Sequence, residues 1–100
     1  MSEKFVSPEQ PPEGLDRELL EILIEECAEV QQRATKMLRF GVNEVQPGQP
    51  LSNAARLSLE FGDLMEVAER CKDRGLINPG QVAVGREAKS QQLAKYLQSN

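Results

Sequence analysis

Hydrophobic residues recur at intervals of three and four through two long stretches of the chain, a spacing that places them along one side of an α-helix. The first stretch runs from Leu15 to about Arg39, and its apolar positions are Leu19, Leu20, Leu23, Ile24, Cys27, Val30, Ala34, Met37 and Leu38. The second runs from Ser52 to about Arg74, and its apolar positions are Leu57, Phe61, Leu64, Met65, Val67, Ala68 and Cys71. The pattern predicts two amphipathic helices.

Glycines and capping residues mark where these helices are expected to begin and end. Gly41 and Gly75 follow the two stretches, and glycine closes many helices because it readily adopts a left-handed conformation. Ser52 is a favourable N-cap for the second helix. The segment from Gly41 to Leu51 contains Pro47, Gly48 and Pro50, so a loop is expected there.

A third helix is expected from Asn78-Pro79 to about Gln98, because an N-cap Asn followed by Pro is a favourable helix start. No stretch alternates in the manner of a strand. The expected fold class is therefore all-α, an antiparallel helical bundle of about three main helices that is completed by oligomerisation. Residues 1–14 are expected to form an extended Pro-rich arm, and residues 15–100 the helical domain.

Composition narrows the chemistry that this domain can carry. The chain has 100 residues, 16 acidic against 12 basic side chains, and no histidine. The absence of histidine excludes Ser-His and Cys-His catalytic pairs and His-ligated zinc. The acidic balance argues against nucleic-acid binding, and no apolar run is long enough for a membrane span. Cys27 and Cys71 are expected to be free thiols that pack in the core of a cytoplasmic protein.

Acidic residues fall where the helical pattern predicts a packed face. Glu26 lies at the edge of the first apolar arc and Glu29 follows about one turn later. Glu60 falls inside the second arc, with Asp63 about one turn later. Ionised carboxylates on a packing face are unfavourable unless another group compensates them. If the two helices pack together, the acids must share protons, pair with bases or hold a cation.

Two kinds of positive charge could compensate these carboxylates. Arg33, Arg56 and Arg70 lie on the same two helices and could neutralise part of the cluster. A divalent cation would neutralise more of it. Ligands that are all oxygen atoms favour Mg²⁺, for which Mn²⁺ is a possible substitute.

The acids also form a recognisable motif. The order Glu25-Glu26-Cys27-Ala28-Glu29, followed by Glu60-Phe61-Gly62-Asp63, resembles the EExxE…ExxD signature of the MazG-like all-α nucleoside triphosphate pyrophosphohydrolases. The resemblance extends over roughly Leu19 to Leu97 and includes the Leu38-Arg39-Phe40-Gly41 segment.

The resemblance implies an activity and a set of site residues. It implies hydrolysis of a nucleoside triphosphate to a monophosphate and pyrophosphate, by metal-assisted attack of water at the α-phosphorus, in a homodimer or homotetramer. The acids that it implies as Mg²⁺ ligands are Glu26, Glu29, Glu60 and Asp63. Glu25 points away from the core on a helical wheel, so at most it supports a ligand. The candidates for phosphate binding are Arg33, Lys36, Arg56, Lys89 and Lys95.

Two other functions fit parts of the same pattern. The acids could form a metal or nucleotide site in a binding module without turnover, or the chain could be a plain helical oligomerisation protein. A pure interaction helix has no reason to place Glu60 within its apolar arc, which disfavours the last alternative. The preferred base and sugar of a nucleotide substrate are not specified by any motif.

Overall fold

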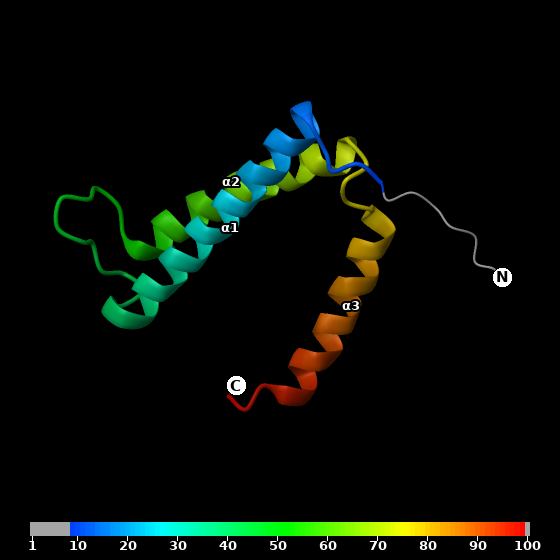
Figure 1. Cartoon of the computed structure of the whole chain (residues 1–100). Coiled ribbons are helices and arrows are strands. Elements are labelled where there is room, and N and C mark those ends of the chain that lie inside the picture. Colours follow the sequence, from blue (N-terminus) through cyan, green and yellow to red (C-terminus); the bar gives the residue numbers. More distant parts are fainter. Residues whose placement is uncertain (1–8, 100) are drawn as a thin grey trace.

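The computed structural model describes residues 9–99 and contains three α-helices in this range, α1 (Gly14–Phe40), α2 (Asn53–Asp73) and α3 (Pro79–Tyr96) (Figure 1). Between residues 9 and 99 the only extended pairing is an isolated bridge between Val45 and Ser52. The all-α class is thus confirmed. Most of the expected N-terminal arm, residues 1–8, lies outside the described residues.

The helix ends follow the capping residues closely. Gly41 has φ 110° and its N–H donates to the Met37 carbonyl at 2.9 Å, which ends α1. Gly75 has φ 78° and follows the end of α2. At the other ends, the Ser52 hydroxyl accepts from Ala55 N–H at 3.1 Å, and the Asn78 side chain accepts from Gln81 N–H at 3.0 Å. These contacts confirm the expected caps of α2 and α3.

Helices α1 and α2 lie side by side and make the main packing contact of the chain (Figure 1). Near the start of α1, Asp16 accepts a hydrogen bond from Arg74 Nε at 2.7 Å, just beyond the end of α2. At the other end of the pair, Asn53 Nδ2 donates to the Gly41 carbonyl at 2.9 Å. The beginning of each helix therefore lies beside the end of the other.

The core of this pair is small. The buried apolar side chains among residues 9–99 are Leu19 and Cys71, and the buried polar ones are Arg33 and Asn53. The expectation that Cys27 packs in the core is wrong, because this residue is exposed. Other positions of the apolar arcs are exposed too, among them Met65 at 59%. The physical reason is that one packed partner covers only a narrow stripe of a helix, so the rest of each apolar arc faces solvent.

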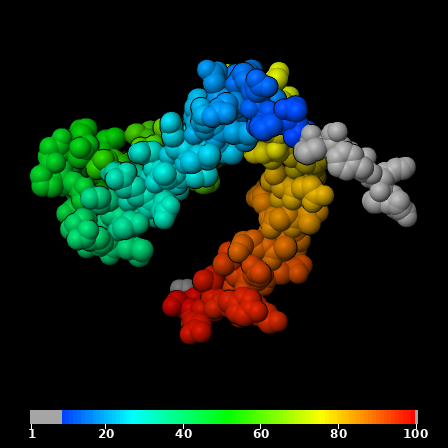
Figure 2. Space-filling view, in the orientation of Figure 1, coloured from blue at the N-terminus to red at the C-terminus, as the bar shows by residue number. Residues whose placement is uncertain are grey.

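Helix α3 stands apart from the α1–α2 pair. It has no buried residue, and Figures 1 and 2 show it diverging from the pair after the turn at residues 74–78. The radius of gyration is 18.4 Å, whereas a compact domain of about 100 residues has a value of about 13 Å. In a single chain, therefore, two helices pack together and the third does not complete a bundle.

Candidate metal centre

Three acids from the two packed helices meet at the middle of the α1–α2 pair. Glu26 on α1 and Glu60 and Asp63 on α2 each offer a carboxylate oxygen, and these oxygens all lie within 4.8 Å of one another. Glu60 and Asp63 share one side of α2 because they are three residues apart. The opposed arrangement of the helices brings Glu26 against both of them.

Glu26 is the member of the cluster whose ionised form is least stabilised by its surroundings. Its Oε1 atom is buried and has no hydrogen-bond partner among the described residues. Burial raises the pKa of this carboxyl above its ordinary value, and the neighbouring charges of Asp63, Glu60, Glu29 and Glu25 raise it further, in that order. A buried acceptor facing like charges is stabilised either by a proton or by a cation.

Glu29 lies close to the cluster but is not one of its converging members. It is half-buried and lines a shallow hollow on the outer side of α1 with Gln32, Lys36 and Arg39. Its carboxylate is not among the three whose oxygens lie within 4.8 Å of one another. Of the four expected ligands, the structure brings three together and leaves Glu29 beside them.

Glu25 is exposed on α1. It is the last of the charges that raise the pKa of Glu26. This position agrees with the helical wheel, which directed Glu25 away from the packed face.

The donor set fits a hard divalent cation. All three converging ligands are carboxylates, and oxygen ligands suit Mg²⁺, Mn²⁺ and Ca²⁺, so ligand type alone does not choose among them. Mg²⁺ is usually held by one or two carboxylates together with water and substrate phosphates. Asp63 is exposed, so one side of the cluster stays open to such additional ligands.

The basic candidates are spread over the molecule. Arg33 is buried on α1, and Arg56 is half-buried on α2. The Lys36 ammonium lies 5.7 Å from the centre of the Phe40 ring, near the end of α1. Lys89 and Lys95 are exposed on α3, which diverges from the pair (Figure 1). A single chain therefore does not bring these two lysines to the carboxylates.

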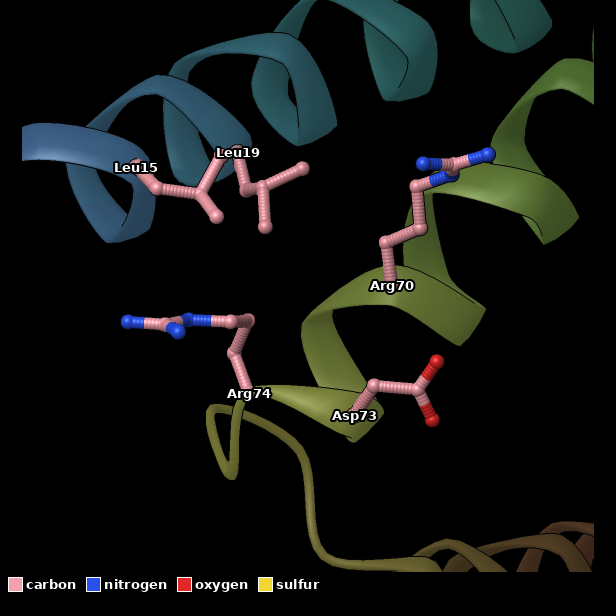
Figure 3. Close-up of a pocket in the computed structure, with 5 residues that line it drawn as sticks. All are labelled: Leu15, Leu19, Arg70, Asp73 and Arg74. Atoms are coloured by element: carbon pink, nitrogen blue, oxygen red, sulfur yellow. The ribbon is translucent and has the colours of Figure 1, made fainter.

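A separate hollow lies at the end of the pair where α1 begins. Its walls are formed by Leu15, Leu19, Arg70, Asp73 and Arg74 (Figure 3). Arg74 is engaged with Asp16, and Arg70 donates to Glu66 at 2.9 Å. The arginines here are already paired with carboxylates, so this hollow adds no group to the metal centre.

Two polar side chains, Arg33 and Asn53, are buried although the apolar pattern did not predict it. Arg33 was expected as a candidate phosphate ligand or as a positive charge beside the acids, but not as a buried residue, and Asn53 was not singled out. Asn53 is 1% exposed and directly follows the Ser52 cap. A polar residue immediately after a cap, facing the end of the preceding helix, is the signal that could have identified it.

No helix within residues 9–99 combines the length and the apolar character that crossing a membrane requires.

Comparisons of this chain with protein-family models, with curated proteins and with solved structures found no match.

Proposed function

We propose that the chain is a Mg²⁺-dependent nucleoside triphosphate pyrophosphohydrolase, which converts a nucleoside triphosphate and water to a monophosphate and pyrophosphate. The observation that carries the proposal is the convergence of Glu26, Glu60 and Asp63 within 4.8 Å, with a buried Glu26 oxygen that has no protein partner. The EExxE…ExxD order of the acids, which resembles the MazG-like enzymes, supports the choice of reaction.

In this proposal the three converging acids hold the cation, and Glu29 joins them by a change of side-chain rotamer. Bound Mg²⁺ would supply positive charge to the triphosphate oxygens. Water attacks the α-phosphorus, the bond between that phosphorus and the bridging oxygen breaks, and pyrophosphate leaves. A carboxylate of the cluster that is not fully engaged accepts the proton of the water.

The proposal includes an assembly, an antiparallel bundle completed by a second copy of the chain as a homodimer or a dimer of dimers. The support is the amount of apolar surface that one chain leaves uncovered. Leu38 is 89% exposed, Ile24 69% and Leu59 61%. Large exposed apolar patches usually mark interaction surfaces. A partner could also bring basic residues such as Lys89 and Lys95 to the carboxylates.

The decisive experiment is a product assay on purified protein with Mg²⁺ and a panel of ribo- and deoxyribonucleoside triphosphates. We expect monophosphate and pyrophosphate, and we expect Glu60→Gln to lose most of the activity while keeping its helical content. Glu66→Gln is the matched control, because Glu66 is on the same helix but pairs with Arg70 in an exposed position. Orthophosphate with a diphosphate as products would contradict the proposed cleavage site.

A binding module is the second candidate, favoured by one observation. Lys89 and Lys95 lie on α3, away from the carboxylates of the same chain, so the single chain gathers few basic groups for a triphosphate. Cation binding without release of pyrophosphate from any nucleotide in the panel would establish this alternative.

A further inference from the structure

The most unusual basic side chain in the structure is Arg33. Its exposed fraction is 7%, and among residues 9–99 it is the one buried basic residue. Its Nε and Nη1 atoms are buried and have no hydrogen-bond partner there. Buried N–H groups are nearly always bonded, and an unpaired buried guanidinium is costly. This arginine therefore has unused capacity to bind an anionic or polar acceptor.

The position of Arg33 on α1 relates it to the metal centre. It follows Glu26 by seven residues, which places the two within about 20° of each other around the helix. Long side chains on a helix extend back toward its N-terminus. The Arg33 side chain is thus expected to extend toward the turns that carry Glu29 and Glu26.

Despite this proximity along the helix, Arg33 takes part in none of the ion pairs found among the described residues. The carboxylates of the cluster are therefore not its partners. A buried guanidinium that makes no ion pair is available to a different anion. Arginine binds phosphate oxygens well, because its planar group presents several N–H donors.

Charge balance points to the same kind of ligand. Three ionised carboxylates and one divalent cation leave a formal charge of about −1, which would repel a triphosphate. A permanently charged side chain on the α1 side of the cation would offset this repulsion. Arg33 is suited to the role because its charge persists at all physiological pH values.

We propose that Arg33 binds the phosphate chain of the substrate, on the α1 side of the carboxylate cluster. Because Nε and Nη1 are buried in the structure, the guanidinium changes its side-chain rotamer to reach a phosphate oxygen. The contact recognises the polyphosphate and not the base or the sugar, so its contribution is equal for all nucleotides. This inference rests on the proposed function and specifies how that site takes its substrate.

The test uses inorganic tripolyphosphate as the probe, because it contains the phosphate chain without a nucleoside. Its affinity is measured by calorimetry in the presence of Mg²⁺ for the parent, Arg33→Met, Arg33→Lys and the control Arg17→Met. Arg17 is an exposed arginine on the same helix that pairs with Glu21. We expect Arg33→Met to weaken binding by about tenfold or more, Arg33→Lys to weaken it less, and Arg17→Met to have little effect.

A second measurement separates phosphate binding from a merely structural role. The shift of the melting temperature by Mg²⁺ alone should be kept or enlarged in Arg33→Met, because removing a positive charge does not weaken cation binding. Loss of that shift together with tripolyphosphate binding would overturn the proposal in favour of a structural role. If Arg33→Met does not fold, Arg33→Lys decides, and an affinity equal to that of the parent would contradict the proposal.

The two proposals can fail separately. Tripolyphosphate binding that depends on Arg33, without release of pyrophosphate from any nucleotide, would uphold the inference on Arg33 and refute the enzyme activity. Pyrophosphate release with an unchanged KM in Arg33→Met would do the opposite. A parent protein that does not bind tripolyphosphate with Mg²⁺ would overturn the role of Arg33.

Discussion

Glu26 and Asp63, from two different helices, hold carboxylate oxygens within 4.8 Å of each other at the middle of the α1–α2 pair. Asp63 is also the neighbouring charge that does most to raise the pKa of Glu26. Two carboxylates at this distance repel each other when both are ionised, and a cation between them converts the repulsion into attraction. The relationship predicts that metal binding and folding are linked.

The first prediction is that Mg²⁺ or Mn²⁺ stabilises the folded protein and that the effect saturates. A ligand that binds only the folded state at 100 times its Kd stabilises it by about 2.7 kcal/mol. Melting temperature measured against cation concentration tests this, with sodium at equal ionic strength as the control. Asp63→Asn should reduce the shift, because it removes one converging carboxylate. An equal shift in Asp63→Asn and the parent would show that the cation binds elsewhere.

The second prediction concerns pH in the presence of a chelator. The pKa of Glu26 is raised above its ordinary value of 4.5, so the folded state binds this proton more tightly than the unfolded state does. The stability that the proton contributes is complete below the ordinary value and is lost as the pH rises through the raised value. Metal-free Glu26→Gln should therefore lose less stability than the parent between pH 4.5 and neutrality.

Denaturant midpoints across this pH range measure the difference, and Glu66→Gln serves as the control because it removes an exposed glutamate from α2. Saturating Mg²⁺ should reduce the loss of stability in the parent, because the cation compensates the ionised cluster. The same pH dependence in the parent and in Glu26→Gln would mean that Glu26 does not carry the effect.

The helices themselves could be predicted from the sequence because their signals are local. Ser52 and Asn78 cap their helices within three residues, and Gly41 supplies a positive φ directly after α1. Each of these interactions depends on neighbours in the chain, so residue type and order are sufficient to predict it.

The extent of packing could not be predicted in the same way. The apolar arc of α1 includes Leu19 and Ile24, but the first is 7% exposed and the second 69% exposed. A helical pattern shows which residues share a side, and the number of partners on that side decides how many are covered. For the site, spacing predicted that Glu26, Glu29, Glu60 and Asp63 would converge, and the structure brings together all of them except Glu29. Which carboxylates point at one another depends on tertiary contacts that spacing does not specify.

The third prediction follows from the exposed apolar positions and concerns assembly. Ile24 is 69% exposed on α1, so in a monomer its replacement by Asp should have little effect on folding. If a second copy covers α1, Ile24→Asp buries a charge in the interface and should shift light scattering toward a smaller species. Ile24→Val is the control, because it keeps an apolar surface. A parent that is monomeric at micromolar concentration would contradict the proposed assembly.

The last prediction concerns Asn53, which fixes how α1 and α2 are joined. It is 1% exposed, and its Nδ2 donates to the Gly41 carbonyl at 2.9 Å and to Glu44 Oε1 at 3.1 Å. Asn53→Ala removes the part-buried hydrogen bond to the Gly41 carbonyl, which should lower the free energy of unfolding by about 1 kcal/mol. Urea denaturation measures the loss, and Asn43→Ala, in an exposed position of the same loop, should cost much less.

Replacing Asn53 should also change the geometry of the carboxylate cluster. Asn53 bonds Gly41 and Glu44 in the loop between the two helices, and we expect this loop to fix the register of α2 against α1. That register brings Glu60 and Asp63 opposite Glu26. In the folded fraction of Asn53→Ala, Mg²⁺ should therefore raise the melting temperature less than in the parent. Asn53→Asp should behave like Asn53→Ala, since a carboxylate cannot donate to the Gly41 carbonyl. A destabilised variant with an undiminished Mg²⁺ response would show that Asn53 holds the loop but does not set the geometry of the metal centre.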